Sequence, residues 1–249
     1  MLRYNNKAYA NTSTHRYGLP DSESKTQRIS KGLMRNWNEF GAVAPESPQM
    51  ISVFCSSMEL IAHFEAQQPD RAMQLLRTMW GYIWNSPYAV QSSLIEGYFH
   101  DGRWHYPFTL YDPAYISHAH PWASGPTIVL TSYYVGLTIR NPEHTLWSFE
   151  PQPGLVKKSG FAVAGITSNA KGLFSAGWEI DDDGVFEMAI RAPIGTRGTI
   201  SIPTFSKEIA DVLFDGTFLD HHSLTLGKHH ASLNEVDGGN HSLIVRYKS

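Results

Sequence analysis

The spacing of apolar residues divides the chain into a helical first part and a β-rich second part. In the first part, apolar residues recur every three or four positions, which is typical of one face of an amphipathic helix. Ile29, Leu33 and Trp37 show this spacing most clearly. A Gly and two prolines predict a loop at 40–49. The spacing predicts helices at 21–37, 49–67, 69–85 and 124–137.

After Arg140-Asn141-Pro142 the apolar residues alternate with polar ones, as in strands that bury one face. The strand-like runs are separated by Gly, Pro and Asp turns. The acidic segment 181–184 joins two runs and lacks the ligand spacing of a calcium loop, so we predict a hairpin turn there. The runs lie at 161–167, 172–180, 185–192, 198–205 and 241–247. We therefore predict an antiparallel β-sandwich over 143–249, after a helical domain over 1–142.

Composition narrows the class of protein. The 249 residues are 42% hydrophobic and 17% charged, which is enough apolar material for a real core. The net charge is −3 without a basic stripe, which argues against a nucleic-acid or membrane partner. No apolar run approaches the roughly 20 residues of a membrane span, and the first residues lack the apolar core of a signal peptide. A single cysteine, Cys55, excludes an intramolecular disulfide and is expected to be buried.

Aromatic and histidine side chains gather in the stretch Ser92–Pro126. Its three carboxylates are Glu96, Asp101 and Asp112. Carboxylates among rings that can stack on the apolar face of a sugar indicate a carbohydrate site. The alternative is a loop-rich connection whose rings only cap a core. From the residues alone both interpretations stay open.

Other kinds of chemistry find little support. No nucleophile elbow, phosphate loop or dinucleotide fingerprint occurs, so no cofactor is predicted. His118 and His120 form an H-x-H pair, but a third ligand is missing, so no metal is predicted. Glu59 and Glu65 flank the apolar stripe of a predicted helix and are expected to face solvent.

Five segments, taken in order and spacing, resemble the C-terminal portion of the α-L-rhamnosidases, especially their fungal-like branch. The resemblance runs from about Ile29 to Pro203. The segments are FGAVAPESP (40–48), LLRTMWGYIWNSP (75–87), SSLIEGY (92–98), YISHAHPWASGPT (115–127) and APIGTRGTISIP (192–203).

The resemblance implies part of an (α/α)6 six-hairpin barrel followed by a β-sandwich. Members of this family cleave terminal α-linked rhamnose from glycosides with inversion and without a cofactor. Glu96 falls where the family places its general base, and His120 matches a histidine that lines the sugar pocket. The remaining matches are aromatic wall positions and an acidic loop residue, namely Trp80, Tyr98, Trp122 and Glu46.

The chain also departs from the family pattern. Ile95 stands before the base, where the family usually has Trp, and Pro121 follows the pocket histidine, where it often has Gly. The predicted helices are too few for six hairpins, and the family's general acid lies in an earlier region. We therefore expect the C-terminal part of such an enzyme, extracellular by family habit. The alternatives are a non-catalytic carbohydrate-binding or interaction protein, and an incomplete reading frame whose product does not fold stably.

Overall fold

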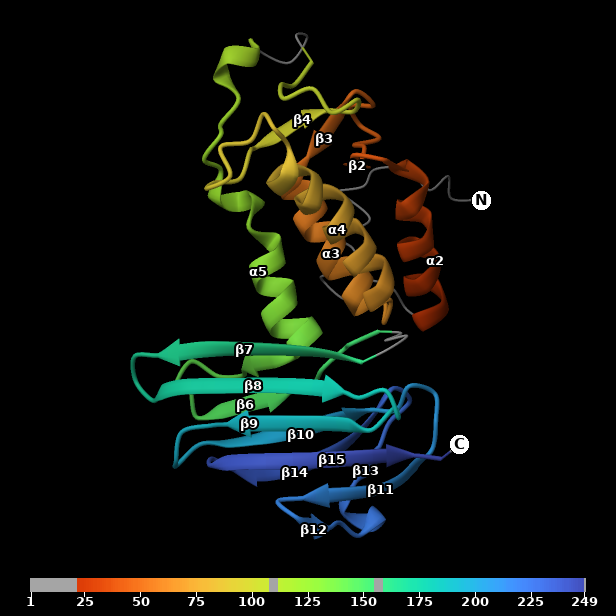
Figure 1. Ribbon diagram of the computed structural model, residues 1–249, viewed down its shortest axis with the longest axis vertical. Helices are drawn as coiled ribbons and strands as arrows, with labels where there is room; N and C mark the ends of the chain where they lie inside the picture. Colours follow the sequence, from red (N-terminus) through yellow and green to blue (C-terminus); the bar gives the residue numbers. More distant parts are fainter. Residues whose placement is uncertain (1–21, 108–111, 155–158, 249) are drawn as a thin grey trace. The chain divides into compact units, whose positions relative to one another are not determined.

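The computed structural model describes residues 22–107, 112–154 and 159–248. The chain forms two compact units, Met1–Val129 and Leu130–Ser249. The first is helical and the second is built of β-sheets (Figure 1). This division lies upstream of the expected boundary at 142/143, because strand β5 (Leu137–Ile139) pairs with β6 (Leu146–Phe149) of the second unit.

The predicted helices are present, in the predicted order. The first unit contains α2 (Glu23–Leu33), α3 (Val53–Glu65), α4 (Pro69–Asn85) and α5 (Gly125–Val129). A π-helical stretch, η4 (Leu130–Val135), follows α5 and ends before Gly136, whose φ of +91° suits a helix end. The short 3₁₀ turns of this unit are η1 (Met34–Asn36), η2 (Pro113–Tyr115) and η3 (Pro121–Ala123).

Two helices are shorter than predicted, because strands replace their ends. In the predicted helix at 49–67, the residues before α3 form strand β3 (Met50–Ser52). The Ser52 side chain then caps α3 by accepting from the Cys55 N–H (3.4 Å). Trp37 lies in β1 (Trp37–Asn38), which pairs with β2 (Gly41–Ala42), and not in the first helix.

Glu59 is buried, which corrects the expectation that it faces solvent. Its side chain is 3% exposed, whereas Glu65 on the same helix is exposed as predicted. Glu59 Oε1 accepts from Trp37 Nε1 (2.6 Å) and lies 3.3 Å from His63 Nε2. Helical periodicity places a polar residue beside the apolar stripe, but it cannot show that polar partners from another segment cover that residue.

The same network connects three helices. His63 Nδ1 lies 2.7 Å from Ser30 Oγ of α2, and Arg71 of α4 donates to that oxygen (3.0 Å). When His63 carries its ring proton on Nε2, the hydrogen bonds all run in one direction, from Arg71 through Ser30 and His63 to Glu59. Ser30 and His63 are 0% exposed, so the hydroxyl in this Ser–His–Glu arrangement cannot reach a substrate.

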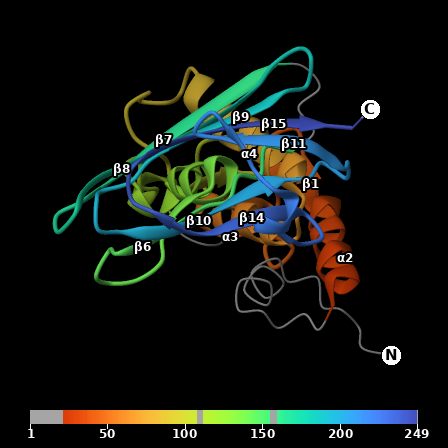
Figure 2. The ribbon, with the colours of Figure 1, turned by 90° about the horizontal axis from the view of Figure 1, so that it is seen from below.

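The second unit contains two sheets. The five-stranded sheet has the order β13-β14-β10-β6-β5, and the six-stranded sheet has the order β12-β11-β15-β9-β8-β7. They form separate layers in Figure 2. Their remaining strands are β7 (Gly160–Ser168), β8 (Gly172–Ile180), β9 (Phe186–Arg191), β10 (Arg197–Pro203), β11 (Ile209–Phe214), β12 (Thr217–Phe218), β13 (Thr225–Leu226), β14 (His230–Asp237) and β15 (Asn240–Tyr247).

The two sheets bury one common core, in which Trp147 and Trp178 are 2% and 3% exposed. The predicted β-rich second part, the five predicted strands and the hairpin turn at 181–184 are confirmed. The strand pairs are antiparallel with one exception among the described residues, since β10 and β6 are parallel. The predicted antiparallel arrangement therefore does not hold at this pair. In the described part of the chain, no helix is long and apolar enough to cross a membrane.

Candidate active site

Glu96 lies directly before β4 (Gly97–Phe99), a short strand that pairs with β3. In this pairing Ser52, the residue that caps α3, lies opposite Gly97. The Val53 N–H then donates to the Glu96 carbonyl (3.4 Å). The backbone of Glu96 is thereby attached to the start of α3, a rigid element suited to holding a reacting group.

A second segment, 117–120, runs beside the chain around Glu96. The Glu96 N–H donates to the Ser117 carbonyl (2.9 Å), and the His120 N–H donates to the Leu94 carbonyl (2.8 Å). The Ser117 N–H also donates to Glu96 Oε2 (3.2 Å). This contact orients the half-buried carboxylate. The pairing brings together two predicted site residues, Glu96 and His120.

Trp122 adds an exposed aromatic surface to this region. Its side chain is 67% exposed, and its ring centroid lies 6.3 Å from that of the half-buried His120. It also contacts Phe54 of α3, at 5.3 Å between centroids. An exposed indole beside an imidazole can stack on the apolar face of a sugar ring.

The other two predicted aromatic wall residues are buried. Trp80 is 7% exposed, and its Nε1 donates to the Ala123 carbonyl (2.8 Å), which fixes the turn that carries Trp122. Tyr98 is 0% exposed, and its hydroxyl donates to the Phe40 carbonyl (2.7 Å). Burial raises the pKa of Tyr98 well above its ordinary value. Neither ring offers a free face to a ligand in this structure.

Glu46 borders a different depression. Its side chain is exposed at the rim, and the buried Glu59 and the thiol of Cys55 also line this depression. Burial is the main cause of a raised Cys55 pKa, and the charges of both glutamates add to it. The lining residues are Ala42, Val43, Ala44, Glu46, Ser52, Cys55, Ser56 and Glu59, which do not include Glu96.

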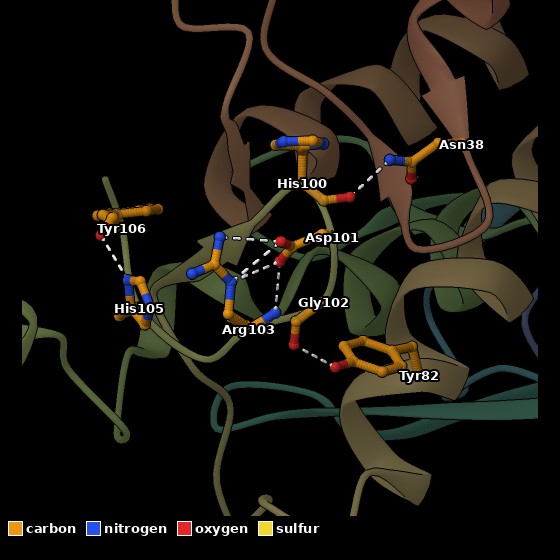
Figure 3. A network of polar contacts seen from close by, with 8 residues as sticks. All are labelled: Asn38, Tyr82, His100, Asp101, Gly102, Arg103, His105 and Tyr106. Atoms are coloured by element: carbon orange, nitrogen blue, oxygen red, sulfur yellow. Dashed lines mark hydrogen bonds and ion pairs between the residues drawn. The ribbon is translucent and has the colours of Figure 1, made fainter. Parts of the chain in front are cut away.

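The two remaining carboxylates of the stretch have structural partners. Asp101 is hydrogen-bonded and ion-paired to Arg103 (2.9 Å; Figure 3), and these contacts lower the pKa of Asp101. The Arg103 guanidinium also lies over the Phe99 ring, 4.4 Å from its centroid. The Asp112 carboxylate accepts from the Ala114 N–H (2.9 Å). Glu96 is therefore the carboxylate of this stretch whose oxygen is oriented by the segment that leads to His120 and Trp122.

Tyr106 is a site residue that the sequence reasoning missed. It is 5% exposed, and its hydroxyl donates to the Glu96 carbonyl (3.1 Å). Its ring lies against Gly97, where an added Cβ would come within 2.1 Å of the Tyr106 hydroxyl oxygen. The one available signal was the glycine directly after Glu96, since glycine permits such a close approach.

We find no group of three or more His, Cys, Asp or Glu side chains that could hold a metal among residues 22–107, 112–154 and 159–248. The two paired segments carry an acceptor carboxylate (Glu96) and an imidazole (His120), and an exposed indole (Trp122) follows the second segment. Such a set can position a polyhydroxylated ring and accept a proton from a water molecule.

The order of a helical unit followed by a β-sheet unit recurs in solved structures. The solved structures with this fold include the α-L-rhamnosidases of Dictyoglumus thermophilum (TM-score 0.73, 15% identity), Streptomyces avermitilis in complex with L-rhamnose (0.66, 19%) and Aspergillus terreus (0.64, 16%). The matches cover 96%, 97% and 97% of this chain and 25%, 22% and 24% of those chains. No family model and no curated protein matches the sequence.

The resemblance to α-L-rhamnosidases is thus confirmed at the level of the fold. The chain spans about a quarter of the length of the enzymes that it matches. At sequence identities of 15 to 19%, the similarity to these enzymes is one of backbone structure and not of individual side chains.

Proposed function

We propose that this chain forms the base side of the active site of an α-L-rhamnosidase-like glycoside hydrolase. The observation that carries the proposal is the half-buried Glu96 carboxylate, which accepts from the Ser117 N–H. The backbone of Glu96 is also hydrogen-bonded to the segment that bears His120. In the proposed reaction Glu96 accepts a proton from water as the water attacks the anomeric carbon, with inversion. His120 and Trp122 hold the rhamnose ring.

The domain assignment is part of the same proposal. We assign the helical unit to the C-terminal portion of an (α/α)6 six-hairpin domain and the second unit to a β-sandwich. The matched enzymes are about four times longer than this chain, which supports a site completed by other sequence. We accordingly place the general acid outside these 249 residues. The substrate class is a rhamnose-containing glycoside.

Two substrates with different leaving groups test whether the chain has a base and lacks a general acid. A general acid is needed to protonate a poor leaving group, whereas a phenolate stabilised by nitro groups leaves without protonation. We expect the chain to hydrolyse 2,4-dinitrophenyl α-L-rhamnoside slowly and 4-nitrophenyl α-L-rhamnoside far more slowly. Glu96→Gln should lower the faster rate by about 10²- to 10⁴-fold.

Asp101→Asn is the matched control, because it removes another carboxylate of the same stretch that is paired with Arg103. It should retain the rate of the unaltered chain. Equal rates for the two variants would remove Glu96 from the role of base. Binding of L-rhamnose without any turnover would instead support the carbohydrate-binding alternative.

A further inference from the structure

The geometry points to Tyr106 as the residue that positions the Glu96 carboxylate, through its hydrogen bond to the carbonyl of Glu96. This inference rests on the proposed function and extends it to a positioning residue that does not itself touch the substrate. It concerns the peptide unit between Glu96 and Gly97, which Tyr106 contacts with both its hydroxyl and its ring.

The first step of the argument is the rigidity of Tyr106. The side chain is 5% exposed, so its ring has little freedom to move. Gly97 lets that ring lie directly on the backbone, since a Cβ there would come within 2.3 Å of Tyr106 Cε1. The hydroxyl is thereby held 3.1 Å from the Glu96 carbonyl oxygen.

The second step connects this carbonyl to the carboxylate. The peptide unit after Glu96 determines how the residue is rotated relative to segment 117–120. That rotation brings Glu96 Oε2 to 3.2 Å from the Ser117 N–H. If the Tyr106 hydroxyl is lost, the Glu96 carbonyl is left with the longer hydrogen bond from the Val53 N–H (3.4 Å). The Glu96 peptide can then tilt, and the contact between Oε2 and the Ser117 N–H weakens. The effect on the carboxylate is transmitted through the backbone.

Tyr106→Phe tests the inference, because it keeps the buried ring and removes the hydroxyl. A lost neutral hydrogen bond corresponds to about a three- to tenfold change in a local equilibrium. We expect the hydrogen-exchange rate of the Ser117 amide, measured by NMR, to rise by about that factor. Glu96→Ala, which removes the acceptor itself, sets the upper limit of this rise. The affinity for L-rhamnose, measured by calorimetry, should fall by a similar factor.

Tyr247→Phe is the matched control. The Tyr247 hydroxyl likewise donates to a backbone carbonyl, that of Pro203 (2.7 Å), but it lies in the second unit. This variant should leave Ser117 exchange and rhamnose affinity unchanged. The inference is overturned if Tyr106→Phe leaves Ser117 exchange at the original rate, or if both variants raise it equally. If the unaltered chain binds no rhamnose, the proposed function fails, and the exchange measurement still decides the role of Tyr106.

Discussion

Replacing Glu59 with alanine should destabilise the helical unit strongly, because Glu59 is a buried acceptor shared by two donors. The change leaves Trp37 Nε1 without its 2.6 Å partner and His63 Nε2 without its 3.3 Å partner. Each buried group left unsatisfied costs about 1–3 kcal/mol; His63 is buried, whereas Trp37 is half-buried and costs less. We therefore expect a loss of about 2–4 kcal/mol in the free energy of unfolding. Glu59→Gln, which keeps an acceptor of the same shape, should cost less.

Chemical denaturation followed by the helical circular dichroism signal measures this loss, since α2, α3 and α4 lie in the first unit. Glu65→Ala is the control on the same helix and should change stability by no more than about 0.5 kcal/mol, because Glu65 is exposed. If the Glu59 and Glu65 variants are equally stable, Glu59 does not act as the buried acceptor described above.

Three further predictions concern packing, thiol reactivity and pH. Gly81 lies inside α4 with open space around it, so Gly81→Ala should raise the stability of the folded chain by about 0.5–1 kcal/mol in thermal melts. Gly125→Ala should lower that stability by about 1–3 kcal/mol, because the added Cβ would lie 2.8 Å from Ser57 Cα. The raised Cys55 pKa predicts slower iodoacetamide alkylation in the folded chain than in the denatured chain near neutral pH, and equal rates would contradict it. Burial lowers the pKa of His230 below 6.5, so on acidification the unfolded state binds the proton before the folded state does. The stability of the folded chain should therefore fall as the pH drops below about 6.5. Between about pH 7 and pH 5, the His230→Gln variant should lose less stability than the unaltered chain.

The fold could be predicted from the sequence where local signals are strong. Helix α4 begins at Pro69, a residue favoured in the first helical turn, and carries a regular apolar stripe. Hairpin β8–β9 alternates cleanly and turns at 181–184. Strand β6 gave no such signal, because three of its four residues are buried on both faces of the sheet. Its parallel pairing with β10 depends on residues far apart in the sequence, which no local pattern reveals.

The site could be predicted only in part, for a related reason. The resemblance singled out Glu96 and His120, and the structure pairs their segments. The Ser117 N–H donates to the Glu96 carboxylate, and the Tyr106 hydroxyl donates to the Glu96 main-chain carbonyl. Neither Ser nor Tyr is distinctive in a sequence. The resemblance assigned Trp80 to a wall of the sugar pocket, whereas the structure buries its ring at 7% exposure.

The burial of Ile95 shows what the replacement of the family's usual Trp does at this position. Ile95 is 1% exposed, so the side chain before Glu96 packs into the unit and does not offer a face to a sugar. The Trp that the family usually has before the base therefore has no counterpart at position 95. Trp122, at 67% exposure next to His120, offers an exposed aromatic face just after the segment that is hydrogen-bonded to Glu96. Under the proposed function, stacking on the sugar falls to this indole and not to residue 95.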